Sequence, residues 1–260
     1  MSKSLQKILK YEFLNIFRDR WIFVYTAIVA VTIFSVQKIC GEFQKTVLTL
    51  SSLSVVFVPL ITSFFTTLYW YYSDRFTQLM ATQPVKRSHI FLARYGALTF
   101  SLSACYVVGT VLGAALSGSF SLGLVVLIAM NVLLTFIFIA LSMLISAQVE
   151  DRMRGVGLVF GLWLYFVLIH DGLLLLGLVA LREYPMDILG GVLGSLSPIG
   201  LSRVVLLMFN EGSLLLGHTG ALVREIMTSW QGYLMAIGIS VVWAIVPLLF
   251  GVRSFKKKDF

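Results

Sequence analysis

The residue of this chain whose position most strongly suggests chemistry is Asp171, an acidic side chain inside the apolar run 156–181. A carboxylate within a membrane-spanning helix costs roughly 2.5–3.5 kcal/mol on insertion scales, and such residues commonly serve a function. His170 precedes it directly. Successive residues of a helix point about 100° apart, so we expect that the two side chains do not share one face. Two interpretations stay open: a functional carboxylate, or a structural one that is hydrogen-bonded to another span.

Other residues with catalytic potential are scattered along the chain. There is no GxxxxGK[ST] motif, and the glycine-rich stretch GGVLGSLSP at 190–198 contains no lysine, so the chain cannot bind ATP in the P-loop manner. HExxH, GxSxG and CxxC are also absent, and the three histidines lie far apart, at His89, His170 and His218. We therefore expect neither enzyme activity nor a cofactor in this chain. An intramembrane enzyme or a channel is the competing class.

Soft side chains in the segment 182–229 are the only ones that suggest a metal. They are Met186, Met208, His218 and Met227. Thioethers suit Cu(I), but the spacing is irregular, and methionine more often fills apolar gaps. The two cysteines, Cys40 and Cys105, belong to different apolar runs. We expect no metal site in this chain.

The composition indicates a helical protein that crosses a membrane several times. Hydrophobic residues make up 58% of the chain and charged residues 12%, whereas about a quarter of a soluble domain is charged. The apolar runs are continuous, and a transmembrane barrel would need alternating ones. The net charge of +8 does not indicate a nucleic-acid partner, because the basic residues flank apolar runs, as membrane topology requires.

One amphipathic helix and six spans organise this all-α chain. Residues 1–20 are expected to form an amphipathic cytoplasmic helix at the membrane surface; a packed helix without lipid contact is the alternative. Residues 21–260 then form a single transmembrane domain. Its predicted spans, each near the ~20 residues needed to cross, are 21–38, 50–72, 97–116, 122–147, 156–181 and 230–251.

The distribution of basic residues predicts the orientation of these spans. The segments 1–20, 73–96, 148–155 and 252–260 carry 15 of the 20 lysines and arginines. Cytoplasmic segments are the basic ones, so both termini are expected in the cytoplasm of a bacterial inner membrane. The long loop 182–229 then faces outward. It contains the apolar run Ile199–Phe209, interrupted by Arg203, which is too short to cross and is expected to be re-entrant or interfacial.

The cytoplasmic segment 73–95 is the longest charged stretch between two spans. Phe76, Leu79 and Met80 have helical spacing, and Pro84 ends that helix because it lacks an N–H group. A second helix, capped by Ser88, is expected to lead into the third span. This arrangement would form a rigid inner protrusion that can transmit force from a partner. The alternative is a solvated loop whose charges only set topology.

The same segment resembles a pattern of type 2 ABC exporter permeases, RGT-x-(E/D)-x-LL-x-x-P-(V/I)-x-R after the second span. The chain reads RFTQLMATQPVKR from Arg75 to Arg87, with phenylalanine where glycine is usual and an upstream acidic cluster reduced to Asp74. The resemblance implies a coupling segment at 73–95 on which ATPase subunits dock. The residues that it implies for this contact are Arg75, Phe76, Thr77, Leu79, Met80, Pro84, Val85 and Arg87.

Three further stretches are similar to the NosY-type subfamily of these permeases. They are GLWLYFVLIHDGLLLLGLV (161–179), SPIGLSRVVLL (197–207) and the C-terminal WAIVPLLFGVRSFKKKDF. The resemblance implies a six-span subunit that pairs with itself and binds two cytoplasmic NosF-like ATPases, which hold ATP and Mg²⁺. It also implies a periplasmic NosD-like partner and a role in assembling the copper centres of nitrous oxide reductase. General exporters of small molecules or lipids, and gliding-motility permeases, share the architecture.

Overall fold

The computed structural model describes residues 3–73, 86–118, 120–180, 196–209 and 230–257, and every regular element in these ranges is a helix. The prediction of an all-α protein is therefore confirmed. The elements are α1 (Lys3–Phe17), α2 (Arg20–Cys40), α3 (Phe43–Tyr72), α5 (Arg87–Ser117), α6 (Leu122–Gln148), α7 (Arg152–Leu164), the π-helix η1 (Tyr165–Ile169), α8 (His170–Ala180), α10 (Pro198–Phe209) and α12 (Trp230–Lys257).

Six helices in the described ranges are long and apolar enough to cross a membrane, as predicted. They are α2, the part of α3 from Lys45, α5, α6, the continuous α7–η1–α8 helix as far as Leu174, and α12 from Leu234 to Lys256. The predicted spans overlap these helices. The largest difference is in α5, which begins ten residues before the predicted span at 97.

Short polar residues and glycines determine where several of these helices begin and end. The side chains of Asp19, Ser121 and Asp151 accept hydrogen bonds from backbone N–H groups at the starts of α2, α6 and α7. These N–H groups have no acceptor within the helix. Gly118, with φ of 70°, ends α5 in the left-handed conformation that glycine tolerates.

The predicted cap at Ser88 is wrong. Helix α5 already begins at Arg87, and Lys86 occupies the N-cap position without a side-chain hydrogen bond. The helix that was expected to begin at Ser88 and the third span are thus one helix of 31 residues. Ile90, Phe91 and Arg94 are buried soon after this start, so packing of the first turns stabilises the helix although no side chain caps it.

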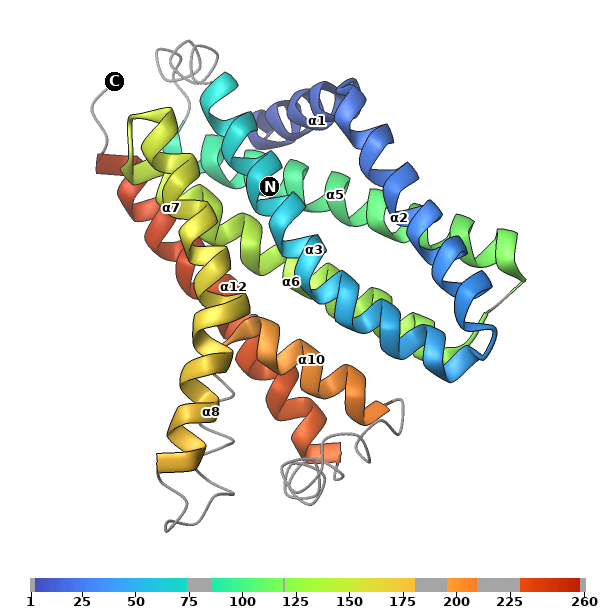
Figure 1. The fold of residues 1–260 in the computed structure, drawn as a ribbon. Coiled ribbons are helices and arrows are strands. Elements are labelled where there is room, and N and C mark those ends of the chain that lie inside the picture. Colours follow the sequence, from blue (N-terminus) through green and yellow to red (C-terminus); the bar gives the residue numbers. More distant parts are fainter. Residues whose placement is uncertain (1–2, 74–85, 119, 181–195, 210–229, 258–260) are drawn as a thin grey trace.

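Helices α5 and α6 form the centre of the bundle. In their most apolar windows 67% and 61% of the residues are buried, against 22% for α2 and α12. Helix α2 packs along α5, α3 and α12 pack along α6, and α1 crosses α5 near its start (Figure 1). The outer helices expose apolar side chains, as a bilayer allows because lipid tails are as apolar as leucine.

Two glycines of α5 allow α2 to approach very closely. A Cβ atom at Gly109 would lie 2.8 Å from the carbonyl oxygen of Thr26, and one at Gly113 would lie 2.7 Å from that of Ala30. Small residues four positions apart are the usual device for close packing of membrane helices. The pair therefore fixes α2 against the centre of the bundle.

Helix α10 occupies the position of the predicted re-entrant or interfacial segment. Its 12 residues would span about 18 Å, short of the ~30 Å hydrocarbon core. Leu201 and Leu206 are buried, and the helix contacts α3, α6 and α12. The remainder of the predicted outer loop, 182–195 and 210–229, lies outside the described residues.

Candidate functional site

The predicted coupling segment connects α3 to α5, and the structure describes only its two ends. Arg75, Phe76, Thr77, Leu79, Met80, Pro84 and Val85 lie outside the described residues. Arg87, the first residue of α5, donates a hydrogen bond of 3.4 Å to the backbone carbonyl of Lys256 in α12. The segment therefore begins after the end of α3 at Tyr72 and ends beside the last turns of α12.

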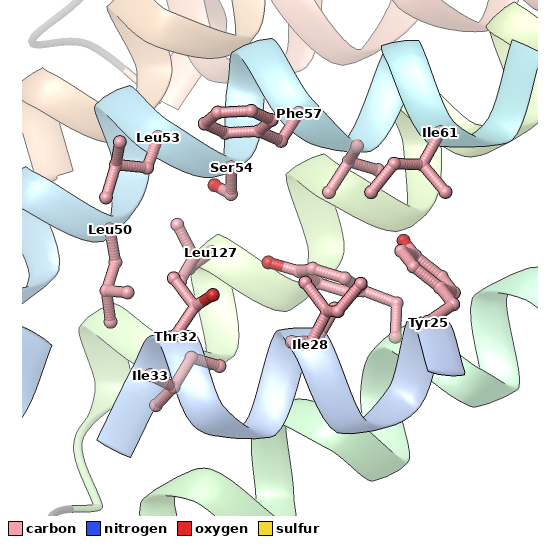
Figure 2. Close-up of a pocket in the computed structure, with 13 residues that line it drawn as sticks. Tyr25, Ile28, Thr32, Ile33, Leu50, Leu53, Ser54, Phe57, Ile61 and Leu127 are labelled. Carbon is pink, nitrogen blue, oxygen red and sulfur yellow. The ribbon is translucent and has the colours of Figure 1, made fainter. Parts of the chain in front are cut away.

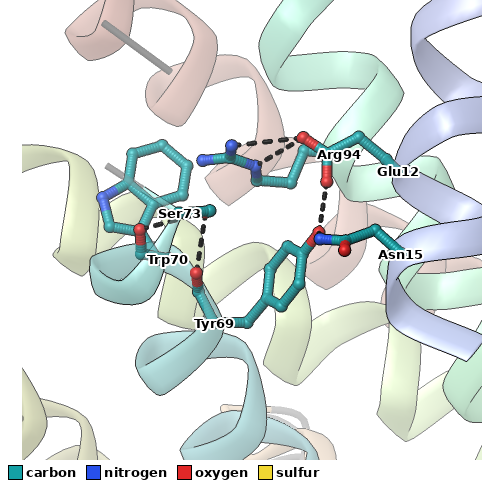
Figure 3. A network of polar contacts seen from close by, with 6 residues as sticks. All are labelled: Glu12, Asn15, Tyr69, Trp70, Ser73 and Arg94. Carbon is teal, nitrogen blue, oxygen red and sulfur yellow. Dashed lines mark hydrogen bonds and ion pairs between the residues drawn. The ribbon is translucent and has the colours of Figure 1, made fainter. Parts of the chain in front are cut away.

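A buried carboxylate on α1 ties together the two helices from which this segment emerges, α3 and α5. Arg94 of α5 places Nη2 and Nε 3.2 and 3.3 Å from Glu12 Oε1 of α1. The Tyr69 hydroxyl of α3 donates to the other oxygen of Glu12, and Asn15 Nδ2 donates to that hydroxyl at 3.1 Å (Figure 3). Three helices thus meet on one carboxylate. We call Glu12, Asn15, Tyr69 and Arg94 the ionic lock.

The lock is almost fully removed from solvent. The exposed fractions of the Arg94 and Glu12 side chains are only 2% and 1%. Two buried charges must neutralise each other and fill their remaining hydrogen-bonding positions to offset the loss of hydration. Trp70 adds a cation–π interaction that stabilises the buried charge of Arg94, because its ring centroid lies 5.2 Å from the guanidinium carbon.

An aromatic cluster joins the C-terminal helix to the same end of the bundle. The rings of Trp70, Phe91 and Phe255 lie 5.6–5.8 Å apart, and they come from α3, α5 and α12. Gly251 makes room for this contact, since a Cβ there would lie 2.7 Å from the Phe91 ring. Helices α1, α3, α5 and α12 therefore meet in one block around the predicted coupling segment.

The end of α3 is also held by α7 on a different side. The Tyr71 hydroxyl donates to the carbonyl of Val149 at 2.9 Å, and a Cβ at Gly155 would lie 1.9 Å from that hydroxyl. Arg152 donates to the Tyr72 hydroxyl at 2.9 Å and lies over its ring. Any displacement of the end of α3 would consequently be passed to α7 and η1.

Asp171 pairs with Arg203, and these were two separate candidates in the sequence. Arg203 Nη1 of α10 lies 2.5 Å from Asp171 Oδ2 of α8. About a third of each side chain is exposed. The partner of Asp171 thus comes from the short helix α10 rather than from another span, and both interpretations of this carboxylate stay open.

His170 is buried beside this pair. Only 6% of the residue is exposed, and its Nδ1 has no hydrogen-bond partner in the described part of the chain. The nearest carboxylate oxygen is Asp171 Oδ1 at 3.8 Å. The two side chains do point differently, as expected, because Asp171 is directed to α10 while His170 packs against the ring of Tyr165. The π-helical turn η1 ends immediately before them.

Asp171 lies within the stretch Arg152–Leu174, which is long and apolar enough to cross a membrane. It follows Arg152, the first residue of α7, by 19 positions, which corresponds to about 29 Å of helix.

The sequence contained a signal for the ionic lock that spacing alone could have revealed. Glu12 lies four residues from both Ile8 and Ile16, so it occupies the apolar stripe of the amphipathic helix rather than its polar face. Arg94 is one of the basic residues of segment 73–96, and in the sequence its charge indicates only the orientation of the spans. A carboxylate inside an apolar stripe requires a buried partner, and that partner is Arg94.

The described residues contain no group of three or more His, Cys, Asp or Glu side chains arranged to hold a metal ion. A scan against family models and a search of curated proteins return no match for this chain. What the structure establishes is a multi-pass helical membrane protein with a buried ionic lock at one end of the bundle and a half-exposed ion pair in its other half.

Proposed function

We propose that this chain is the membrane-spanning subunit of an ATP-driven ABC transporter. In this proposal it is not itself an enzyme. Two copies pair, and two cytoplasmic ATPases dock on residues 73–95 of each copy. Six helices suited to crossing a membrane, basic residues concentrated in alternate connecting segments, and the sequence pattern from Arg75 to Arg87 support it.

The observation that carries the proposal is the block of helices around the coupling segment. A protrusion can transmit force only when its two ends are attached to something rigid. Helix α5 is joined to α1 through the buried Glu12–Arg94 pair, and α3 is joined to α1 through the hydrogen bond from Tyr69 to Glu12. An aromatic cluster of Trp70, Phe91 and Phe255 joins both α3 and α5 to α12. A solvated loop that only sets topology has no need of such anchoring.

The block also suggests how movement would spread. Closure of two ATPases on ATP would displace the coupling segments of the two copies. Because a buried, paired charge network is costly to break, α1, α3 and α5 would move together. The contacts of Tyr71 and Tyr72 with α7 would then carry the displacement toward η1, a π-helical turn of the kind often found at functional sites.

The docking step is tested by co-purification. Thr77, Leu79 and Arg87 are replaced together by alanine, and the amount of ABC ATPase that co-purifies from detergent-solubilised membranes is measured. We expect loss of the ATPase while membrane insertion persists. The matched control replaces Lys38, Ile39 and Phe120, which are exposed at the opposite end of the bundle. Undiminished co-purification by the first variant would contradict the docking proposal.

The substrate proposal is narrower and depends on the resemblance at 161–179, 197–207 and the C-terminus. We propose a NosY-like role in assembling the copper centres of nitrous oxide reductase, with a periplasmic NosD-like partner. The ion pair between Asp171 and Arg203 joins two of these three stretches in space, which supports treating them as one functional region. Copper content of nitrous oxide reductase from cells lacking the gene is the measurement, and a normal content would reject this role.

A further inference from the structure

A cavity of about 180 Å³ lies between α2 and α3, although a short turn at Gly41 and Glu42 connects these helices. Tyr106 of α5 and Leu127 of α6 close it toward the centre of the bundle. Ile28 of α2 and Phe57 of α3 line it and are 49% and 52% exposed. The cavity is therefore a slot that opens between two membrane-spanning helices on their outer side.

The slot is elongated along the helix axes. Its lining on α2 extends from Tyr25 to Ile33 and on α3 from Leu50 to Ile61 (Figure 2). At 1.5 Å per residue these stretches cover roughly 12 and 17 Å. An engineered apolar cavity of about 150 Å³ already holds a benzene molecule. The slot therefore has the volume and length to hold a segment of extended hydrocarbon chain.

One polar group in the slot lacks a partner. The Tyr25 hydroxyl is buried, with 4% of the residue exposed, and it has no hydrogen-bond partner among the described residues. Figure 2 shows this hydroxyl directed into the gap between α2 and α3. A buried hydroxyl without a partner is costly, so the slot is complementary to a ligand that brings a hydrogen-bond acceptor to that position.

The unpartnered hydroxyl lies at one end of the slot and close to one face of the membrane. Asp19 and Arg20 mark the start of α2, and Tyr25 follows Arg20 by five residues, or roughly 8 Å. Helical side chains also lean toward the helix N-terminus, which brings the hydroxyl nearer the boundary. The acceptor would therefore lie where headgroups meet hydrocarbon, and the apolar part of the ligand would extend inward along Val29, Ile33 and Leu50.

We propose that the slot binds one acyl chain of a membrane phospholipid from the leaflet on the α1 side, with an ester carbonyl of that lipid accepting the Tyr25 hydrogen bond. An ester-linked chain has the required chemistry in the required order, an acceptor at the boundary followed by hydrocarbon. This site is independent of the transporter proposal, since it requires only that the bundle spans a bilayer.

Native mass spectrometry can test the proposal on the full-length chain. The protein is purified in detergent, stripped of lipid and titrated with a phosphatidylglycerol of one defined mass. We expect one saturable lipid per chain. Leu53→Trp fills the slot and should abolish this binding. Tyr25→Phe keeps the shape of the slot and removes only the donor, so affinity should fall by roughly 2- to 10-fold, the effect of one net hydrogen bond.

Two control variants match these changes at exposed positions outside the slot. Val246→Trp adds an indole to the exposed face of α12, and Tyr165→Phe removes a hydroxyl from a half-exposed tyrosine. Both should bind lipid as the wild type does. Equal lipid binding by wild type, Leu53→Trp and Tyr25→Phe would overturn the proposal. Efficient disulfide cross-linking between two copies of Ile28→Cys in membranes would also overturn it, since a second copy would then cover the slot.

Discussion

The two ion pairs of this protein place the same chemical groups in different surroundings. Glu12 and Arg94 are almost completely buried, and Tyr69 and Trp70 complete their contacts. Asp171 and Arg203 are about one-third exposed and join a short helix to the α7–η1–α8 helix. A buried pair holds its helices rigidly because breaking it leaves a bare charge in an apolar interior. A half-exposed pair can open, because water replaces each partner.

In the proposed transporter, this difference would give the two halves of the bundle unequal mechanical roles. The half that contains the ionic lock is a block of four helices at the described ends of the predicted coupling segment. The half that contains Asp171 has a π-helical turn, a pair that can separate, and a buried histidine whose Nδ1 has no hydrogen-bond partner among the described residues. Movement of the coupling segment would then be received by the first half and expressed in the second.

Breaking the ionic lock should have the largest effect. Glu12→Leu or Arg94→Met alone leaves one buried charge unpaired and should lower the free energy of unfolding in detergent micelles by about 3–5 kcal/mol. The double variant Glu12→Leu with Arg94→Met removes both charges and should recover much of that loss. Denaturant titration of the single and double variants measures the coupling between the two residues. Additive losses would contradict a direct interaction.

Crowding the contact between α3 and α7 should be the next largest effect. Gly155→Ala places a methyl group where the Tyr71 hydroxyl now lies, so the Tyr71 side chain must leave its contact with Val149 or a helix must shift, at a cost of about 1–3 kcal/mol. Gly157→Ala on the same helix meets nothing within 4 Å and is the matched control. Thermal unfolding of the two variants should differ clearly. Equal melting temperatures would show that the end of α3 is not held by α7.

Removing one hydroxyl from the lock separates its hydrogen bonds from its charges. Tyr69→Phe leaves Glu12 paired with Arg94 but takes away the donor to the second carboxylate oxygen. A loss of about 1–2 kcal/mol is expected, because an acceptor in the interior becomes unsatisfied. Tyr165→Phe, at a half-exposed position, should change stability by less than about 0.5 kcal/mol. The same denaturant titration gives both values.

The pair between Asp171 and Arg203 should matter least for stability. Asp171→Asn is expected to cost at most about 1 kcal/mol, since the pair is partly exposed and solvent weakens it. Its effect on function distinguishes the two interpretations of Asp171. If the proposed ATP-coupled function is unchanged in reconstituted vesicles, the carboxylate has a structural role. If function is lost with little loss of stability, the carboxylate takes part in function.

The sequence by itself determined the membrane-spanning architecture. Continuous apolar runs predicted six helices of crossing length because hydrophobicity is a local property that needs no knowledge of neighbours. The short run Ile199–Phe209 was similarly recognisable as a segment that could not cross. Ser88 shows the limit of local rules, since a good capping residue lies inside α5 rather than at its N-cap position.

Only the tertiary structure decided which polar residues meet. Glu12 and Arg94 are 82 positions apart, and Asp171 and Arg203 are 32 apart. Their pairing depends on how α1 crosses α5 and on where α10 enters the bundle. The Tyr25 hydroxyl, which has no partner among the described residues, is the same kind of result, because α3, α5 and α6 contribute to its surroundings together with its own helix. A charge pattern shows that a residue needs a partner, but packing chooses the partner.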